Sequence, residues 1–345
     1  MIVTAPVTTS NSSVSNLAVA MARTTCEQII RANGIDIFVR RHGEGPLVVL
    51  CHGWPDVSYG WRHQLGAIAD AGFHAVAPDM RGFGRSSSPA DVCSYSILDL
   101  VGDVVGLVQA LGESNAIVVG HDWGAHVAWH AALLRPDMFD GVVGLSIPPS
   151  RRPEGPPLEM LRRQGIDTFH WQYFQEPGVA EAEFERDVDL TRRTIVVGKR
   201  LRLVLPRNSG FLGDNPERMP LPAWFTQSDL NHMVETFRRT GFRGGLNWYR
   251  NIDRNWRLTA PWCDAVIRQP ALFMVGSKDG TIKGPVGERR FKDMQTMLPN
   301  LMKTVVLDGA GHWIQRERAS DVSEALILFL EHYRKALVPL VQRRL

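Results

Sequence analysis

Residues 118–125 read Val-Val-Gly-His-Asp-Trp-Gly-Ala, an apolar run that ends in a turn with one glycine on each side of Asp122. A turn of the form Gly-x-nucleophile-x-Gly joins a strand to a helix and presents its central side chain above the edge of a sheet. The backbone of that central residue is strained. We therefore predict that Asp122 is a displayed, reactive side chain at the end of a strand.

The residue type at position 122 narrows the chemistry. An aspartate is already ionised at neutral pH, so it can attack a saturated carbon directly and form an ester that water later cleaves. A serine in the same place would leave an ether instead. The sequence therefore points away from the hydrolysis of esters and amides, and toward the opening of a strained ring or the expulsion of a halide.

Strand and helix patterns alternate on both sides of this turn. Apolar residues at helical spacing over 97–111, with Ser96 as N-cap and Asp99 three residues on, predict a helix that leads into a strand at 116–119. Asn33-Gly34, between two short apolar runs, predicts a hairpin. Further strands are expected at 47–51, 74–77, 141–146, 271–275 and 303–307, and further helices at 125–134 and 321–335. This order predicts an α/β fold with a mostly parallel sheet and helices on both faces.

The alternation is interrupted once. Residues 148–268 are rich in Arg, Trp and Phe, helical in character and without strand alternation, which predicts an inserted helical cap. The flanking segments 26–147 and 269–345 would form the two parts of one α/β core, and 345 residues with 44% hydrophobic content suffice for both units. The Ser-, Thr- and Val-rich residues 1–25 predict a disordered N-terminal tail.

The composition excludes several classes of function. A formal net charge of +3, with the basic residues scattered along the chain, gives no support for nucleic-acid binding. No apolar run approaches the ~20 residues of a membrane span. The cysteines are widely spaced and have no histidine at metal-site spacing, so we expect reduced thiols.

We expect a cytoplasmic location. Residues 17–22 form a short apolar patch that ends in an Ala-x-Ala-like site, but no basic residue precedes it, so a cleaved signal is the less favoured alternative. The sequence leaves the oligomeric state open, including a homodimer.

Two residues late in the chain complete a catalytic triad with Asp122. Asp279 follows the strand at 271–275, and His312 follows the last strand in Gly-Ala-Gly-His-Trp. A loop aspartate is usually a turn former and a lone histidine is usually a satisfied polar residue, so neither is strong alone. Their order in the chain, nucleophile then acid then histidine, matches the α/β-hydrolase arrangement.

The run His52-Gly53-Trp54-Pro55 follows the strand at 47–51. When water attacks an Asp122 ester, negative charge develops on the carboxyl oxygen, and the backbone N–H groups of Trp54 and Trp123 are expected to form the oxyanion hole that receives it. The alternative interpretation of this run is an ordinary turn with a packed tryptophan. Its position directly after a core strand favours the oxyanion hole instead.

Four motifs, two in the core and two in the cap, resemble those of one enzyme family. They are His52-Gly53-Trp54-Pro55, Gly120-His121-Asp122-Trp123-Gly124, Tyr173-Phe174-Gln175-Glu176-Pro177-Gly178 and Leu246-Asn247-Trp248-Tyr249-Arg250-Asn251. Together they resemble the soluble epoxide hydrolases of the α/β-hydrolase superfamily, over residues from about 25 to about 333. The core motifs are shared with haloalkane dehalogenases, whereas the cap motifs are the specific ones.

The resemblance implies a detoxifying enzyme that converts an apolar aryl or alkyl epoxide and water into a vicinal diol. Asp122 would attack an epoxide carbon, two acids from the cap would protonate the opening oxygen, and His312 with Asp279 would activate the water that cleaves the ester. The mechanism requires no metal and no organic cofactor.

The two cap acids are the point at which this chain departs from the family pattern. Tyr249 matches one of the family's ring-opening tyrosines, and His170 stands where the other usually lies. An imidazole can donate the same hydrogen bond. Tyr173 is the alternative second acid, although packing within the cap is its more ordinary role. The residues expected to line the substrate pocket are His52, Pro55, Trp171, Trp248 and Tyr173.

Other functions remain as alternatives. A haloalkane dehalogenase would use the same triad, with the Trp123 indole N–H donating to the leaving halide. Those enzymes commonly carry Asn where Trp54 stands and lack a counterpart of Tyr249. The pair His170-Trp171 also resembles the fluoride pocket of fluoroacetate dehalogenases, whose arginines just after the nucleophile are absent here. A non-catalytic scaffold of the same fold is a further alternative, disfavoured because all three triad members are present.

Overall fold

The computed structural model describes residues 25–198, 204–206, 209–213 and 218–342. The predicted N-terminal tail lies almost entirely outside these residues. One sheet of eight strands forms the centre of the described part of the chain. The strands are β1 (Cys26–Ala32), β2 (Ile35–His42), β3 (Leu47–Cys51), β4 (His74–Pro78), β5 (Ala116–His121), β6 (Phe139–Leu145), β7 (Ala271–Gly276) and β8 (Leu301–Leu307).

The strand order across the sheet is β1-β2-β4-β3-β5-β6-β7-β8. Every neighbouring pair from β4 to β8 is parallel, whereas β2 is antiparallel to both β1 and β4. The structure therefore confirms the predicted α/β fold with a mostly parallel sheet. Because β3, β5, β7 and β8 run in the same direction, the loops that follow them meet at one edge of the sheet.

Helices connect and cover the strands. They are α2 (Arg62–Asp70), α3 (Ile97–Ala110), α4 (Trp123–Leu134), α5 (Pro157–Arg163), α6 (His170–Tyr173), α7 (Val179–Arg186), α8 (Val188–Val197), α9 (Gln227–Thr240), α10 (Arg243–Arg250), α11 (Ile252–Leu258), α12 (Gly284–Met297), α13 (Ile314–Glu317) and α14 (Ala319–Gln342), with short 3₁₀ turns η1 (Ser58–Trp61), η2 (Val92–Tyr95), η3 (Ala260–Trp262) and η4 (Gly280–Ile282). None of the described helices combines the length and the apolar character that a membrane span requires.

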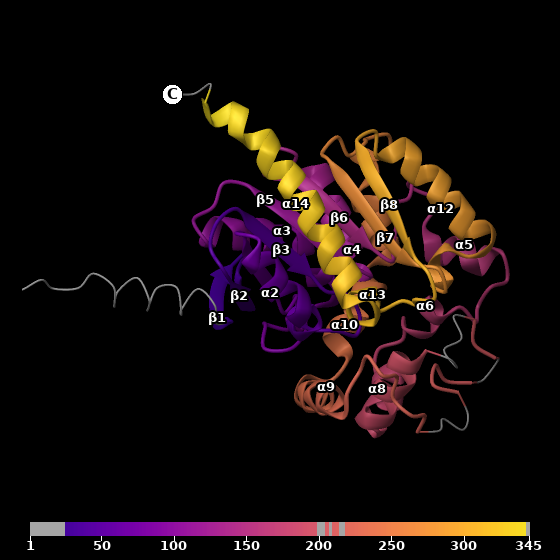
Figure 1. Ribbon diagram of the computed structural model, residues 1–345. Helices are drawn as coiled ribbons and strands as arrows, with labels where there is room; N and C mark the ends of the chain where they lie inside the picture. The colour runs from indigo at the N-terminus through magenta and orange to yellow at the C-terminus, as the bar shows by residue number, and fades with distance from the viewer. Residues whose placement is uncertain (1–24, 199–203, 207–208, 214–217, 343–345) are drawn as a thin grey trace, which may run out of the picture.

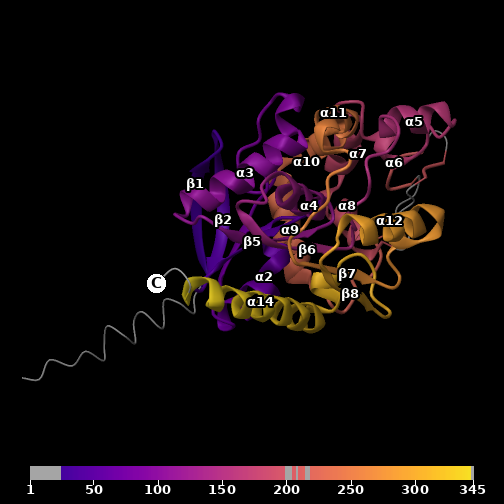
Figure 2. The same ribbon diagram turned by 90° about the horizontal axis from the view of Figure 1, so that it is seen from above.

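The two faces of the sheet carry separate cores. Alternate residues of β3 show the principle: Val48 and Leu50 pack with α2 and α14, whereas Val49 and Cys51 pack with α3 and α4 on the other side. Figure 1 shows α14 crossing one face, and Figure 2 shows α3, α4 and α12 on the opposite face. Burial on both faces explains why β3 and β5 read as continuous apolar runs.

Several local predictions are confirmed. Asn33 and Gly34 both have positive φ and form the turn between β1 and β2. Ser96 and Asp99 form the reciprocal capping box that begins α3. The predicted strands and helices are present, with ends that move by a few residues; β8 begins at Leu301, and the last helix runs to Gln342. The helices α2 and α12 were not predicted.

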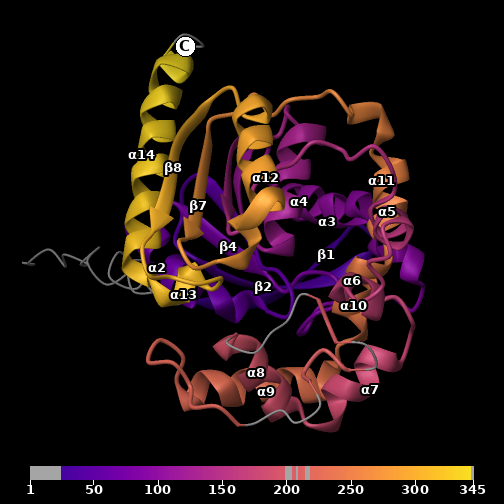
Figure 3. The same ribbon diagram turned by 90° about the vertical axis from the view of Figure 1, so that its right-hand side faces the viewer.

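Helices α5 to α11 lie between β6 and β7 in the sequence. Figure 3 shows α7, α8 and α9 grouped beyond one end of the sheet, with α6 and α10 next to the core. Although this segment separates β6 from β7 along the chain, the two strands are neighbours in the sheet. We refer below to α5–α11 as the cap helices.

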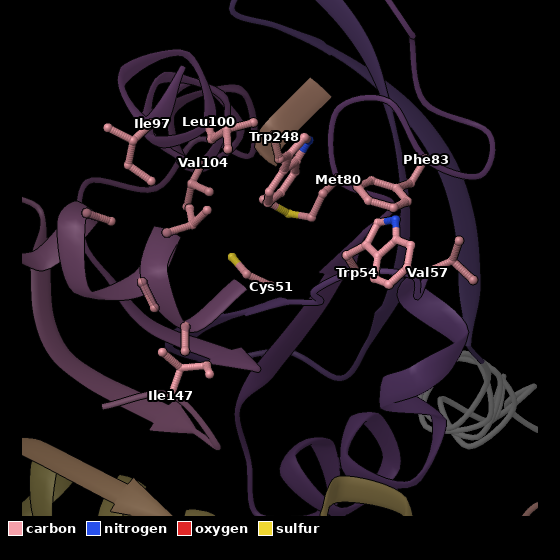
Figure 4. Packing of buried hydrophobic residues seen from close by; sticks show 14 of the residues in the cluster. Cys51, Trp54, Val57, Met80, Phe83, Ile97, Leu100, Val104, Ile147 and Trp248 are labelled. Atoms are coloured by element: carbon pink, nitrogen blue, oxygen red, sulfur yellow. The ribbon is translucent and has the colours of Figure 1, made fainter. Parts of the chain in front are cut away.

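The loop after β4 anchors one of the cap helices. Trp248 of α10 donates its indole N–H to the carbonyl of Arg81 at 3.0 Å. Arg81 in turn forms two hydrogen bonds with Asp103 of α3, at 2.7 and 2.5 Å, and both side chains are at most 5% exposed. Figure 4 shows Trp248 close to Met80, in a cluster that includes side chains of α3. Residues 79–82 therefore form a structural turn that joins the core to the cap helices.

We expect the substitution Asp103→Ala to lower the free energy of unfolding by about 3–5 kcal/mol, because it leaves the buried Arg81 guanidinium without its carboxylate. The measurement is urea unfolding followed by tryptophan fluorescence. Asp137→Ala removes the carboxylate of an exposed pair with Arg135 and is the matched control, expected to change stability little. Equal losses in the two variants would contradict the prediction.

Candidate active site

The turn between β5 and α4 displays Asp122. Its backbone has φ 54° and ψ −121°, a positive φ that residues with a side chain rarely adopt. A Cβ on Gly120 would overlap the backbone of Gly124, and a Cβ on Gly124 would overlap the carbonyl of Cys51. Glycine is required at both positions because there is no room for a Cβ atom: the backbone of residue 120 lies against that of residue 124, and the backbone of residue 124 lies against the end of β3.

The two carboxylate oxygens of Asp122 have different neighbours. Oδ1 accepts a hydrogen bond from the backbone N–H of Trp54 at 2.8 Å. Oδ2 lies 3.5 Å from Nε2 of His312. Burial disfavours the charged carboxylate, but the hydrogen bond and charge of His312, with smaller contributions from His121 and the Trp123 backbone N–H, outweigh it and hold the pKa of Asp122 below its ordinary value. Asp122 is therefore an anion at neutral pH.

Asp279 holds the other side of the His312 ring. Its Oδ2 lies 2.9 Å from Nδ1 of His312, and its Oδ1 accepts from the backbone N–H of Thr281 at 2.9 Å. Burial would raise the pKa of Asp279, but the charge and hydrogen bond of His312 and the Thr281 N–H lower it to about 2. Asp279 stays ionised and orients the imidazole with Nε2 toward Asp122.

The backbone at His312 is fixed as well. Its carbonyl accepts a hydrogen bond from Oγ of Ser146 and lies within hydrogen-bond distance of Nε2 of His121, both at 2.8 Å. The other ring nitrogen of His121 is 3.1 Å from the side-chain amide of Gln315. Burial, followed by the charge of His312, lowers the pKa of His121 to about 4, so it is neutral and can serve as donor at Nε2 and acceptor at Nδ1.

The protonation of His312 depends on the charge of its neighbours. Burial opposes the imidazolium, but the charges and hydrogen bonds of Asp279 and Asp122 raise the pKa of His312 well above its ordinary value. If Asp122 were neutral, one of these two anions would be lost. The pKa of His312 would then fall, and the neutral imidazole could act as a base.

Tyr249 of α10 lies close to Asp122. Its ring centroid is 5.1 Å from that of Trp123 and 5.6 Å from that of Trp54, and the residue is 5% exposed. Burial and the neighbouring Asp122 carboxylate raise the pKa of Tyr249 well above its ordinary value, and a hydrogen bond from the Trp123 side chain opposes this only in part. Tyr249 therefore carries its proton at neutral pH.

The structure brings His170 to Tyr249 and places Tyr173 differently. The ring centroids of His170 and Tyr249 are 6.1 Å apart. The hydroxyl of Tyr173 donates to Oε2 of Glu183 at 2.8 Å, and the same oxygen accepts from the backbone N–H of Phe211 at 3.0 Å. Tyr173 is thus bonded within the cap helices.

The remaining residues expected to line the substrate pocket differ in whether their polar atoms are already hydrogen-bonded within the protein. Nδ1 of His52 lies 2.9 Å from the carbonyl oxygen of Gly53. Nε2 of the same ring accepts a hydrogen bond from the backbone N–H of Met80 at 2.9 Å. The Pro55 carbonyl accepts from Arg192. Trp171 is partly buried and packs its ring against Phe169 and His170. The polar atoms of His52, and that of Trp248 described above, are therefore occupied within the protein.

Sequence reasoning missed a group of buried charges next to this site: Asp56, Arg192 and Arg316. One feature of the sequence could have indicated this group. Arg192 stands at helical spacing from the apolar residues Val188, Ile195 and Val196, so it lies on the buried face of α8. Among the described residues, no group of three or more His, Cys, Asp or Glu side chains is arranged to hold a metal ion.

Comparison with known proteins gives consistent results. The family described as alpha/beta hydrolase fold matches residues 46–319. Epoxide hydrolase A of Mycobacterium tuberculosis is 42% identical to this chain over 315 residues, which cover 88% of this chain and 97% of that protein. The crystal structure of epoxide hydrolase A from Mycobacterium thermoresistibile has a TM-score of 0.84 at 44% identity, and the match covers 89% of this chain and 98% of that one. An epoxide hydrolase from an endophytic Streptomyces has a TM-score of 0.86 at 40% identity, with 90% and 96% covered.

The fold and the match over residues 46–319 define the class, a protein of the α/β-hydrolase fold. The chain belongs to the epoxide hydrolase family of the α/β-hydrolase superfamily. The resemblance that the motifs indicate is confirmed.

Neutralising Asp122 is expected to lower the pKa of His312. The substitution Asp122→Asn keeps the shape of the carboxylate without its charge, as an ester would, and Asp122→Ala is a second neutral variant. The measurement is an NMR titration of the His312 ring in each protein. His232, which packs on Tyr59, serves as the internal control and should titrate as in the wild type. An unchanged or raised pKa of His312 in both variants would show that Asp122 does not control it.

Proposed function

We propose that this chain hydrolyses apolar epoxides to vicinal diols through a covalent ester on Asp122. One observation carries the proposal: the Asp122 carboxylate lies between a backbone N–H donor on one oxygen and an imidazole beside the other. Tyr249, a protonated acid, faces the same carboxylate from the cap. Nucleophile, base and proton donor therefore converge on one place.

In the first step, Oδ2 of Asp122 attacks an epoxide carbon in line with the carbon–oxygen bond that breaks. The epoxide oxygen becomes an alkoxide, which is a poor leaving group unless it is protonated as it forms. Tyr249 donates this proton, and its raised pKa is no obstacle because an alkoxide is a much stronger base than a phenolate. The products of this step are an Asp122 ester, a free hydroxyl group and the phenolate of Tyr249. The phenolate regains a proton from His312, whose pKa falls once the Asp122 charge is lost.

We assign the second hydrogen bond to the opening oxygen to His170. Its ring lies close to that of Tyr249, so the two can reach one oxygen atom between them. The hydroxyl of Tyr173 is bonded to Glu183 instead, which favours His170 over Tyr173.

In the second step, His312 takes a proton from a water molecule, which attacks Cγ of the ester. The negative charge that develops on Oδ1 is stabilised by the backbone N–H groups of Trp54 and Trp123. The intermediate collapses, the bond from Cγ to the ester oxygen breaks, and Oδ2 leaves with the product. This oxygen takes the proton that remains on the new carboxyl group, so the diol is neutral, Asp122 is again an anion and His312 is again cationic. The oxygen of the water stays in the carboxylate of Asp122.

The substrate we infer is an apolar epoxide. The ring of Trp54 packs against Phe174, Phe211 and Tyr249, so the surface beside the nucleophile is aromatic. A haloalkane dehalogenase is the alternative that shares the triad. The Trp123 side chain is hydrogen-bonded to Tyr249, which favours epoxide opening over a halide site. Diol release from an epoxide panel, without halide release from a haloalkane panel, separates the two.

A single turnover in water enriched in oxygen-18 tests the covalent route. With styrene oxide and enzyme in excess, we expect the label to enter Asp122 and the first diol to be free of it, as measured by mass spectrometry of the product and of the peptide that contains residue 122. Asp122→Ala should form no diol above background. Label in the first diol would overturn the proposal, because water would then have attacked the epoxide itself.

Replacing His170 is expected to slow formation of the ester. His170→Phe removes the second donor to the opening oxygen and should lower the rate of ester formation by about 100-fold, whereas His170→Tyr should keep most of it. Tyr173→Phe should have the smaller effect, since its hydroxyl is bonded to Glu183. Rapid-quench measurement of ester formation gives the three rates. A large loss for Tyr173→Phe and none for His170→Phe would reverse the assignment.

A further inference from the structure

Three charged side chains are buried next to the oxyanion loop, which we define as residues 53–56. Asp56 belongs to this loop, Arg192 comes from α8 of the cap and Arg316 comes from α13, and none is more than 3% exposed. Arg316 donates to Oδ1 of Asp56. Arg192 donates to the carbonyl of Pro55. The cap, the oxyanion loop and the segment after β8 are thus joined by charged groups.

Stability does not account for this arrangement. Removing charges from water costs several kcal/mol each, and apolar residues of similar size are often as stabilising as a buried ion pair. Here only Arg316 is paired with the single nearby carboxylate, Asp56, whereas Arg192 bonds a backbone carbonyl, and the polar atoms of all three side chains are incompletely satisfied. Within the described residues, Nε and Nη2 of Arg192, Nε and Nη1 of Arg316 and Oδ2 of Asp56 have no hydrogen-bond partner. The guanidinium of Arg192 also lies 4.9 Å from the ring centroid of Phe237.

The position of the arginines gives a better explanation. Pro55, whose carbonyl Arg192 holds, directly follows Trp54, whose N–H donates to Oδ1 of Asp122. The loop is closed by a hydrogen bond from the Asp56 N–H to the Gly53 carbonyl at 3.0 Å. The loop is therefore compact, and a shift of its Pro55 carbonyl would move the Trp54 donor.

We propose that Arg192 is a positioning residue through which the cap holds the Trp54 N–H against Asp122. The inference rests on the proposed function and adds a structural cause for its second step. Asp56 and Arg316 fix the end of the same loop to the segment that carries His312, since Arg316 lies in the helix that begins two residues after His312. Burial lowers the pKa of Arg192 to about 9 and the charge of Asp56 opposes this, so the group is a cation at neutral pH and its bond to Pro55 is charge-assisted.

The two chemical steps should respond differently to the loss of Arg192. Ring opening uses Oδ2 of Asp122 and the proton of Tyr249, neither of which depends on the Trp54 donor for its charge. Ester hydrolysis places new negative charge on Oδ1, where the Trp54 N–H donates. A displaced donor therefore slows the second step and leaves the first almost unchanged.

The experiment compares Arg192→Met with Arg193→Met. Methionine fills much of the arginine volume without charge or donors, and Arg193 is the next residue of α8, where it pairs with Asp189 outside the loop. We expect Arg192→Met to slow ester hydrolysis by at least about tenfold, as measured by rapid quench and mass spectrometry of the ester. Because the ester accumulates, kcat and KM should fall together while kcat/KM stays within about twofold of the wild type. Arg193→Met should leave both rates unchanged.

A merely structural role would give another pattern. It would lower the fraction of active enzyme, so kcat would fall at constant KM and the ester would not accumulate; this result, or unchanged hydrolysis in folded Arg192→Met, would overturn the inference. If Arg192→Met does not fold, Arg192→Lys is the second variant, because it keeps a cation and a donor at this position. The inference then requires Arg192→Lys to slow ester hydrolysis as well, by a smaller factor. A wild-type enzyme that forms diol with no ester at any time would instead overturn the proposed function, and this inference with it.

Discussion

The site depends on one strained residue, Asp122, held at positive φ where β5 passes into α4. Such a conformation costs of order 1–3 kcal/mol and persists only where the surroundings enforce it. Here the surroundings are the end of β3, against which Gly124 packs, and the parallel strands on either side of β5. The sheet thus holds a backbone conformation that an isolated turn would not keep. As a result, Oδ1 of Asp122 can bond the Trp54 N–H while Oδ2 lies beside His312.

Charge at that carboxylate organises the groups around it. In the resting site the anion sustains the cationic form of His312 and the proton of Tyr249. In the proposed mechanism, esterification of this carboxylate removes both influences together. The base would then become available after the acid has acted, and the order of the steps would follow from a single change of charge. Asp279, ionised throughout, keeps the imidazole oriented during that change.

The features that the sequence predicts well are those encoded over short distances. The capping box at Ser96, the Asn33-Gly34 turn and the glycines around Asp122 each fix local backbone geometry, and the buried strands read as apolar runs. The helices α2 and α12 were missed because neither shows a sustained apolar periodicity; α2 carries Gly66 and charged ends, and α12 begins at a glycine.

The features that the sequence does not predict are contacts between distant residues. The choice between His170 and Tyr173 depends on Glu183, ten residues beyond Tyr173. The ring nitrogens of His52 bond the backbone of residues 53 and 80. Contacts of this kind, like the burial of Arg192, are decided by tertiary packing.

The insertion of the cap between neighbouring strands also sets the sequence of events during synthesis. Chains emerge from the ribosome from the N-terminus onward, and β6 is complete long before its partner β7 leaves the exit tunnel. Until then the nascent sheet has an open edge at β6, and Asp122 lies without Asp279 and His312, which follow β7 and β8. This half-built sheet, with an unpaired strand and uncovered apolar residues, is the stage of folding most exposed to aggregation.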